Sequence, residues 1–306
     1  MNIYDLKRLF YLRESVEKLD HQGSPQALLI DPCPDTDIRR LGILSGSFNP
    51  PTKAHIELAV RARKSYRLDR IFFLISRVTI DKEELEGLAL EDRLLLLSRL
   101  AGDLGWASVV ITSRGLYYEQ AVAIRSLMGR QARIFFVTGM DKVAQILNPR
   151  YYQDRDEALV SFFIEAQLIA ASRGARGEAD LRELLEREEN QNYADRIYFL
   201  PMPVETREFA SSAIRAAIAR GESPAGQLPE MVTSFISETG AFRPAYETRR
   251  RLLEGLYALG EWGKDRADLR KLVALAGEET ERGRRLRAIL GSPVSSMELK
   301  DFLGAL

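Results

Sequence analysis

The sequence is poor in the residues that build metal centres and disulfides. Of its 306 residues, one is cysteine and two are histidine. A single cysteine cannot form an internal disulfide or a cysteine-based zinc site, and two histidines leave little room for a histidine-rich metal centre. Basic and acidic residues number 44 each, so the chain lacks the cationic excess that sequence-independent nucleic-acid binders need. We therefore expect no metal site formed by protein ligands and no nucleic-acid partner.

Long apolar runs are also missing. The longest strongly apolar runs, 71–75 and 134–140, are far shorter than the ~20 residues that span a bilayer. Charged residues interrupt the N-terminal stretch, which does not fit a signal peptide. With 45% hydrophobic and 29% charged residues, the composition is typical of a globular protein. We expect a cytoplasmic protein that does not enter a membrane, and the sequence allows a homo-oligomer without specifying one.

Apolar patterning divides the chain into three regions. Residues 1–40 hold one amphipathic helix, over 4–20, and form an N-terminal helical extension. Between 41 and 243, short buried strands alternate with helices, which predicts an α/β fold with a Rossmann-like doubly wound parallel sheet. Residues 244–306 predict a small C-terminal helical region, with the basic run 249–251 on a solvated helix face. Strands are expected at 41–44, 70–76, 107–113, 132–139, 167–174 and 196–203, and helices at 54–66, 90–104, 119–129, 211–221 and 228–240.

The loop after the first of these strands, 46–55, has the features of a phosphate site. Gly46 can adopt a positive φ, and Thr52 is a good N-cap for the following helix. His55 stands in the first turn, where free N–H groups and the helix dipole favour an anion. A glycine-proline loop with a capping threonine and an ordinary first-turn histidine explains the same residues. The loop is neither a Walker A motif nor a dinucleotide-binding glycine motif.

Two further segments point to anion or ribose binding at the same sheet edge. Ser211 and Ser212 begin a predicted helix, and Arg215 lies one turn further on, which together offer hydroxyls and a guanidinium to an anion. Serines at a helix start are also ordinary caps. Asp141 follows a strand that ends in Gly139, where a carboxylate can hold a ribose hydroxyl or hydrated Mg²⁺, or can cap a helix. The residues alone therefore predict nucleotide or phosphoester binding.

Taken together, these segments resemble the nicotinate/nicotinamide mononucleotide adenylyltransferase family of the HxGH nucleotidyltransferase superfamily. The resemblance covers residues 41–243. The family motifs G-x-F-x-P-[TH]-x-x-H, G-x-D and I-S-S-T-x-I-R correspond to Gly46-Ser47-Phe48-Asn49-Pro50-Pro51-Thr52-Lys53-Ala54-His55, Gly139-Met140-Asp141 and Phe209-Ala210-Ser211-Ser212-Ala213-Ile214-Arg215. Ala54 replaces the glycine of HxGH, and Ala210 replaces a serine of the late motif. The tryptophan that follows G-x-D in bacterial members is absent, and residues 150–152 occupy its neighbourhood.

The resemblance implies an enzyme that joins the AMP moiety of ATP to nicotinate or nicotinamide mononucleotide and releases pyrophosphate, in NAD biosynthesis. Mg²⁺ would be bound mainly through ATP. His55, Thr52 and Arg215 would be catalytic, and the substrate and ATP contacts would come from Gly46, Ser47, Phe48, Lys82, Gly139, Asp141, Tyr151, Ser211 and Ser212. Lys82 is equally explained as a solvated surface lysine, and Tyr152 is an alternative to Tyr151 for stacking on the pyridine ring. Two alternatives remain: another nucleotidyltransferase of the superfamily, such as a pantetheine-phosphate adenylyltransferase, and a non-catalytic nucleotide sensor.

Overall fold

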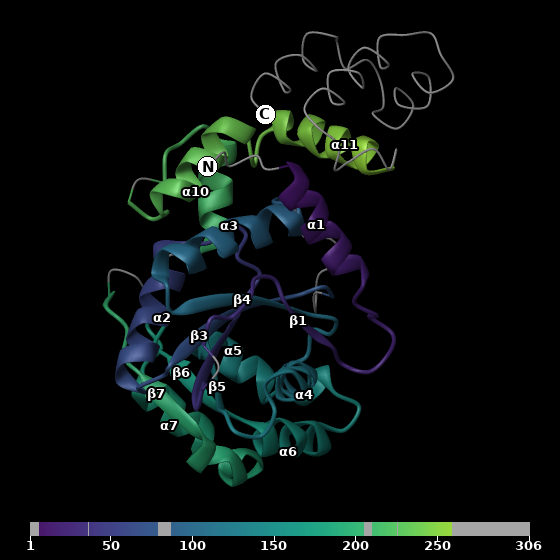
Figure 1. Cartoon of the computed structure of the whole chain (residues 1–306). Helices are drawn as coiled ribbons and strands as arrows, with labels where there is room; N and C mark the ends of the chain where they lie inside the picture. The colour runs from purple at the N-terminus through teal and green to yellow at the C-terminus, as the bar shows by residue number, and fades with distance from the viewer. Residues whose placement is uncertain (1–5, 36, 79–86, 205–209, 225, 259–306) are drawn as a thin grey trace, which may run out of the picture.

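The computed structural model describes residues 6–35, 37–78, 87–204, 210–224 and 226–258. They form a central sheet with helices on both of its faces (Figure 1). In chain order the elements are α1 (Leu6–Glu17), β1 (Ala27–Leu29), β2 (Arg40–Ser45), α2 (Lys53–Ser65), β3 (Arg70–Ser76), α3 (Leu90–Leu104), β4 (Ala107–Thr112), α4 (Tyr117–Met128), β5 (Arg133–Gly139), α5 (Met140–Ile146), η1 (Pro149–Tyr151), α6 (Arg155–Glu165), β6 (Ala166–Ala171), α7 (Glu178–Glu186), η2 (Glu188–Arg196), β7 (Ile197–Leu200), α9 (Ser211–Ala219), α10 (Glu230–Thr239) and α11 (Pro244–Ala258).

The sheet has seven strands in the order β1-β4-β3-β2-β5-β6-β7. Strands β2 to β7 are parallel, and β1 joins β4 in the antiparallel direction. The chain moves outward from β2 through β3 to β4, and then crosses to the other side of β2 to form β5. The strand order therefore reverses between β2 and β5, which is where such sheets open a crevice beyond the carboxyl ends of their strands. This arrangement confirms the predicted doubly wound α/β fold.

Each face of the sheet carries its own hydrophobic core, because successive side chains of a strand point to opposite faces. In β5, Phe135 and Val137 join the core formed with α1, α2, α3, α9 and α10. Ile134 and Phe136 join the core formed with α4, α5, α6 and α7. Burial on both faces explains why the parallel strands read as continuous apolar runs rather than as alternating ones.

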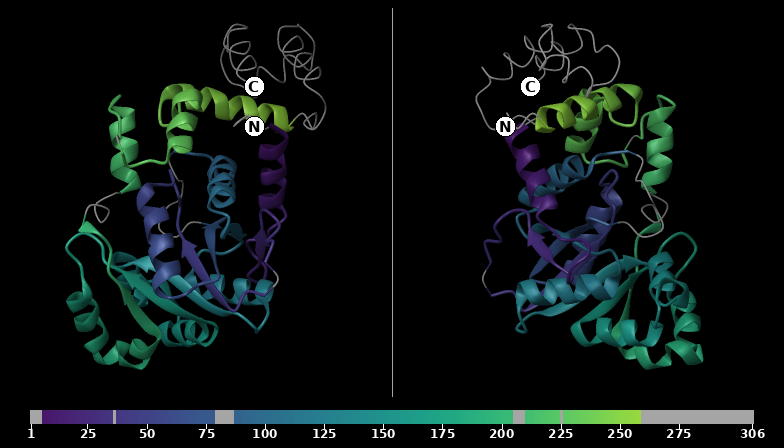
Figure 2. Two further views of the ribbon diagram at one scale, coloured as in Figure 1. Left: turned by 60° about the vertical axis from the view of Figure 1, so that its left-hand side comes forward. Right: turned by 90° about the vertical axis from the view of Figure 1, so that its right-hand side faces the viewer.

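Helices α1 and α11, which belong to the two terminal regions, pack on the same face of the sheet. Helix α1 contacts α3, and the two views of Figure 2 show α11 lying across the ends of these helices. Arg249 of α11 is buried and pairs with Asp92 of α3, so the expectation that the whole run 249–251 is solvated was wrong. The N-terminal region also contributes β1, a strand too short to be recognised by its periodicity. The region boundaries at 40 and 243 remain predictions.

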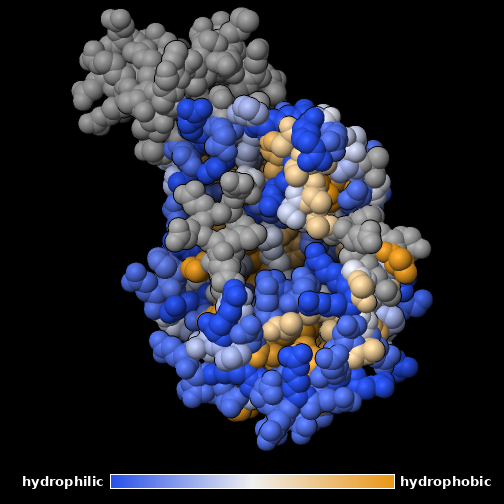
Figure 3. All heavy atoms as spheres, turned by 180° about the vertical axis from the view of Figure 1, so that it is seen from behind, coloured by the Kyte–Doolittle hydropathy of each residue, from blue (hydrophilic) through white to orange (hydrophobic). Residues whose placement is uncertain are grey.

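Hydrophilic side chains cover most of the molecular face seen in Figure 3, with smaller apolar patches between them. Among the described helices, none combines the length and the apolar character that crossing a bilayer requires. Among the described large hydrophobic residues, Ile164 on α6 has the highest exposed fraction, and Val160, also exposed, lies one turn before it.

Candidate active site

Three neighbouring strands, β2, β5 and β6, end at the edge of the sheet where the strand order reverses and where such folds open a crevice. Gly46 follows β2, Gly139 is the last residue of β5, and Arg173 lies shortly after β6. Leu44 pairs with Val137, and Gly139 pairs with Ala171, so the three strand ends are in register. The sequence-predicted loops therefore begin side by side, as the parallel sheet requires.

Thr52 and His55 fold into a reciprocal cap at the start of α2. The Thr52 hydroxyl accepts a hydrogen bond from the His55 backbone N–H, 3.4 Å away, and the Thr52 N–H donates to Nδ1 of His55 at 3.0 Å. This is the capping-box geometry with histidine in the place of the usual glutamate or glutamine. The predicted N-cap Thr52 is confirmed, and the His55 side chain forms the second half of the cap.

The cap also fixes the protonation state of His55. Because Nδ1 accepts a hydrogen bond from the Thr52 N–H, the neutral ring carries its own proton on Nε2. Burial and the nearby Arg173 charge lower the pKa of His55 to about 4. The ring packs against Phe48, with centroids 5.0 Å apart. At neutral pH the site therefore presents a held, uncharged imidazole with an N–H donor.

Thr52 is fully buried, and its hydroxyl lies 2.8 Å from Nδ1 of His55. In this geometry its side chain orients the histidine instead of facing the crevice. Phe48 is buried as well and has a φ of 45°, so only its backbone is available to a ligand. Both were predicted as contacts to the nucleotide, and the structure places their side chains behind the loop surface.

The loop is held from beneath by the start of α3. Arg93 is buried and donates from Nη1 to the Ser47 carbonyl at 3.0 Å. The Leu88 N–H donates to Oδ1 of Asn49 at 2.9 Å, and Asn49 is fully buried. Ser47 itself is exposed. The surface of the loop is thus free for a ligand while its backbone is fixed by groups on its protein side.

The start of α9 contacts the same loop, so two motifs that were predicted at one edge of the sheet meet in the structure. Arg215 donates from Nη1 to the Asn49 carbonyl at 2.8 Å, and Ser211 donates to the Pro50 carbonyl at 3.1 Å. Ser212 is exposed. The N-cap of α9 is Ala210, which makes no side-chain cap, and the two serines lie inside the helix. The simple capping explanation for these serines therefore does not hold.

Asp141 lies in the first turn of α5, beyond the end of β5. The N-cap is Gly139, so Asp141 is not the capping residue. Its Oδ1 is buried and has no hydrogen-bond partner within the described part of the chain, and its Oδ2 lies 3.8 Å from Nη1 of Arg173. Leaving a buried carboxylate oxygen without a hydrogen bond costs free energy, and a bound hydroxyl or cation would remove that cost.

Arg173, whose charge acts on both His55 and Asp141, was not predicted from the sequence. Its signal was available: the predicted strand 167–174 ends in Ser-Arg-Gly at the same sheet edge. The structure ends that strand at Ala171, which leaves Arg173 in the loop. A cation between a phosphate-type loop and a carboxylate adds positive charge where an anionic ligand would sit.

Four tyrosines lie close to one another, and one of them, Tyr117, is near Asp141. Tyr117 donates to or accepts from the Thr138 hydroxyl at 3.2 Å, and burial followed by the Asp141 charge raises its pKa. Tyr118 lies 6.2 Å from Tyr152, centroid to centroid. Tyr152 donates to the Ile146 carbonyl, while Tyr151 is half-buried beneath the Arg150 guanidinium. The pair 117–118 was not predicted, although it begins a helix at the same sheet edge.

One predicted phosphate contact lies outside the part of the chain that the structure describes. Lys82 lies in 79–86, outside the described residues. Within the described ranges, no group of three or more histidine, cysteine, aspartate or glutamate side chains could hold a metal ion.

Comparison with known proteins finds relatives that match this chain over nearly their whole length. The chain is 28% identical over 211 residues to a Bordetella avium protein named "Probable nicotinate-nucleotide adenylyltransferase", which covers 68% of this chain and 100% of that protein. It is 28% identical over 221 residues to a Rubrobacter xylanophilus protein of the same name, with 70% and 98% covered.

A solved structure supports the fold. Plasmodium falciparum nicotinic acid mononucleotide adenylyltransferase, complexed with NaAD, is similar with a TM-score of 0.50 and 17% identity, over 65% of this chain and 95% of that chain. The sequence model of the cytidylyltransferase-like family matches residues 43–217, which include the loop after β2, the end of β5 and the start of α9. The match spans more than half of the sequence and contains the whole described crevice, so the chain belongs to the cytidylyltransferase-like family.

Proposed function

We propose that this protein is a nucleotidyltransferase that transfers the AMP moiety of ATP to nicotinate or nicotinamide mononucleotide and releases pyrophosphate, a reaction of NAD biosynthesis. One observation carries the proposal: Arg215 and Ser211 of α9 are joined by hydrogen bonds to the loop that presents His55. Two anion-binding helix starts thus converge on one crevice. The names of the relatives from Bordetella avium and Rubrobacter xylanophilus support this substrate class.

The reaction needs no covalent intermediate with the protein. An oxygen of the mononucleotide 5′-phosphate attacks the α-phosphorus of ATP, and a new P–O bond forms. The bond from the α-phosphorus to the oxygen it shares with the β-phosphate breaks, and that oxygen leaves with pyrophosphate. Catalysis then consists of positioning the two phosphates and stabilising the charge that develops on the phosphoryl oxygens.

His55 supplies the donor for the α-phosphoryl oxygens. Its Nε2 carries the proton because Nδ1 is occupied by the Thr52 N–H. The ring stays neutral well below physiological pH, so it acts as a fixed hydrogen-bond donor rather than as an acid. We assign Thr52 to the orientation of this ring, because its buried hydroxyl contacts Nδ1.

Arg215 and the α9 serines are assigned to the leaving pyrophosphate. Arginine carries five N–H donors, and the Asn49 carbonyl uses Nη1 of Arg215. The remaining donors, the exposed Ser212 hydroxyl and the N–H groups of the first turn can face an anion. Lys82 stays a proposed phosphate contact. Gly46, Ser47 and Gly139 would contribute backbone groups at the strand ends.

The acceptor is assigned to the side of the crevice that Asp141 and the tyrosines border. Asp141 would bind a ribose hydroxyl through its unpaired Oδ1. Tyr151 would stack on the pyridine ring, since Tyr152 is tied to the Ile146 carbonyl. Arg173 would pair with a phosphate, and its contact with Asp141 keeps it at the crevice.

The described residues offer Mg²⁺ one carboxylate, that of Asp141. One unpaired carboxylate oxygen, Oδ1 of Asp141, stands at the crevice, and no described cluster of acidic side chains could bind an ion alone. Mg²⁺ keeps several waters and is commonly held by substrate phosphates with one or two carboxylates. When bound, the ion would neutralise charge on the phosphates of ATP. Asp141 could hold it directly or through a water.

The experiment that tests the function measures pyrophosphate release from ATP and Mg²⁺ with each acceptor in turn. Nicotinate mononucleotide, nicotinamide mononucleotide and 4′-phosphopantetheine are the three acceptors, and dinucleotide formation is followed by chromatography. We expect turnover with at least one pyridine mononucleotide. Turnover with phosphopantetheine alone, or folded protein that binds ATP and releases no pyrophosphate, would contradict the proposal.

A further inference from the structure

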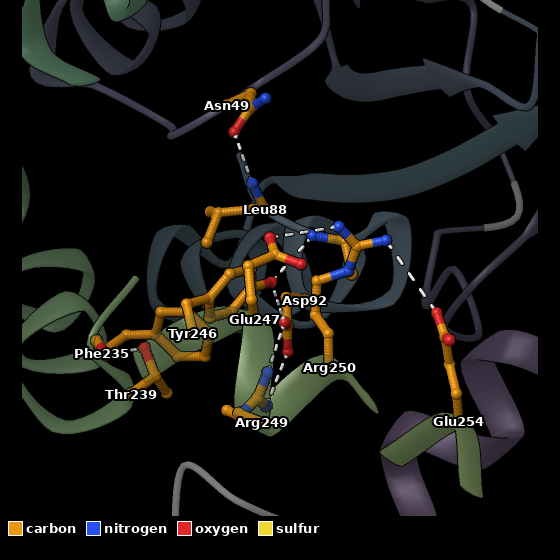
Figure 4. Close-up of polar contacts among 11 residues, drawn as sticks. Asn49, Leu88, Asp92, Phe235, Thr239, Tyr246, Glu247, Arg249, Arg250 and Glu254 are labelled. Atoms are coloured by element: carbon orange, nitrogen blue, oxygen red, sulfur yellow. Dashed lines mark hydrogen bonds and ion pairs between the residues drawn. The ribbon is translucent and has the colours of Figure 1, made fainter. Parts of the chain in front are cut away.

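The start of α11 is fastened to the start of α3 by a buried polar cluster (Figure 4). Arg249 donates to both carboxylate oxygens of Asp92, at 2.6 and 2.9 Å. Tyr246 donates its hydroxyl to the same carboxylate and accepts from the Ala89 N–H at 2.8 Å. Asp92, Tyr246 and Arg249 are all buried. The cluster ties residues more than 150 positions apart in the sequence.

Such a cluster fixes geometry more than it adds stability. A buried ion pair gains little over apolar packing, but loss of one partner leaves an uncompensated buried charge. Here the carboxylate receives a bidentate guanidinium and a hydroxyl, so its orientation is set from several directions. The first turn of α3 therefore has one well-defined position relative to α11.

That first turn supports the loop that carries His55. Arg93, adjacent to Asp92 in the sequence, donates to the Ser47 carbonyl, and the Leu88 N–H donates to the Asn49 side chain. The turn before α11 reaches the same place: a Cβ at Gly87 would lie 2.6 Å from Oδ1 of Asn49 and 2.9 Å from Cε1 of Phe242. The chain of contacts from α11 to the loop is therefore continuous.

We propose that Asp92, Tyr246 and Arg249 are positioning residues, which hold the start of α3 so that Arg93 and Leu88 keep the 46–55 loop in its ligand-ready shape. Helix α11 thus contributes to the geometry of the site through its contacts with α3 rather than through His55 or Arg215. The inference rests on the proposed function for its kinetic consequence, but the structural coupling can be measured without it.

The test compares Tyr246→Phe, Arg249→Met and Arg249→Lys with wild type. Tyr246→Phe keeps the ring volume and removes only the hydroxyl, so it remains informative if Arg249→Met folds poorly. Arg249→Lys keeps the charge and loses the bidentate fork. Arg125→Met is the matched control, because Arg125 makes a partly buried ion pair with Glu165 at 2.7 Å that joins α4 to α6 on the other face of the sheet.

Two readouts are needed, amide hydrogen exchange over 46–55 and steady-state kinetics. We expect Tyr246→Phe and Arg249→Met to raise exchange in 46–55 at least about tenfold, which is a loss of local protection. We expect kcat to fall about ten- to a hundredfold, with the ATP KM near its wild-type value, because misplacement of the loop acts on the transition state. Arg249→Lys should lie between wild type and Arg249→Met. Arg125→Met should leave both readouts unchanged.

The outcomes separate the inference from the function. Unchanged exchange over 46–55 in both Tyr246→Phe and Arg249→Met overturns the inference, whether or not the wild type is active. A rise in exchange that is equal throughout the protein also overturns it, because it shows global destabilisation only. An inactive wild type with selective exchange at 46–55 refutes the proposed function and leaves the coupling established.

Discussion

His55 combines two tasks in one ring, since Nδ1 completes a helix cap and Nε2 is left to donate. We predict that His55→Ala lowers turnover by about 10²- to 10³-fold, because one preorganised donor to a developing oxyanion is worth ~3–4 kcal/mol. The lost cap costs about 1 kcal/mol of stability, which leaves the fold intact. Turnover and thermal unfolding measured on the same preparation check both effects. Near wild-type turnover would reduce His55 to a capping residue.

Arg215 has two possible roles, as a phosphate ligand and as a support of the loop. It was predicted as a phosphate ligand, and the structure also gives it the Asn49 carbonyl. We predict that Arg215→Ala weakens ATP binding about ten- to a hundredfold and leaves mononucleotide binding nearly unchanged. Arg215→Lys should recover part of the loss, because a point charge cannot reproduce the guanidinium fork. Calorimetric titration with each ligand decides the question, and equal weakening of both would assign Arg215 only to the support of the loop.

Sequence reasoning found the residues whose neighbours lie close along the chain. Thr52 and His55 are three positions apart, so their meeting on one helical turn followed from helix geometry. The role of Arg93 could not be predicted, because its contact with Ser47 depends on the packing of α3 beneath the loop. Arg173 was missed for a simpler reason: the predicted strand was drawn too long and included it.

At the scale of single elements, the segment before α3 has a backbone position that favours glycine. Gly87 has a φ of +118°, and a Cβ there would collide with Asn49 and Phe242. We predict that Gly87→Ala lowers the free energy of unfolding by roughly 1–3 kcal/mol, because both backbone strain and the collision oppose it. Urea unfolding provides the measurement.

Gly102, within α3, is the matched control for this substitution. It lies near the end of the helix, it is exposed, and a Cβ there would meet nothing within 4 Å. We predict that Gly102→Ala raises stability by about 0.5–1 kcal/mol, because alanine loses less backbone entropy than glycine in a helix. A stabilising change at both glycines would show that Gly87 is not held at positive φ in solution.

The element pattern of the parallel sheet could be predicted because burial on both faces leaves a strong signal. The strand expected at 70–76 and the helix expected at 90–104 match β3 and α3 residue for residue. Strand β1 could not be predicted, because its three residues gain their structure only by pairing with β4. The burial of Arg249 depends on Asp92, which stands far away in the sequence, so no local pattern could reveal it.

At the scale of the whole molecule, the described helices of the terminal regions, α1 and α11, are part of the hydrophobic core. Leu9, Leu12 and Val16 of α1 and Tyr246 of α11 belong to the same hydrophobic cluster as the strands. The end of α11 also reaches α1, where Tyr257 donates to a Glu17 carboxylate oxygen at 2.5 Å. Contacts of this kind join both ends of the described chain to the sheet, so changes at either end should be felt in global stability.

The pH dependence of that global stability should carry a signature of His55. The unfolded histidine has an ordinary pKa near 6.5, and burial together with Arg173 lowers the folded value to about 4. Between these values the unfolded state binds more protons than the folded state, so stability falls as the pH falls through this window. Well above pH 6.5 the histidine is neutral in both states, and its stabilising effect is fully present.

We predict that the free energy of unfolding of the wild type drops about 2 kcal/mol more between pH 7 and pH 5 than that of His55→Asn, which cannot titrate at this position. Urea midpoints at fixed ionic strength measure the difference, provided that the slope with denaturant is the same for both proteins. His21→Asn, at the other histidine of the chain, is the control. Arg173→Met should narrow the gap, because it removes the second cause of the low pKa. Parallel pH profiles for wild type and His55→Asn would mean that the imidazole titrates as it does in water, and its assignment as a neutral, partly buried donor would then be wrong.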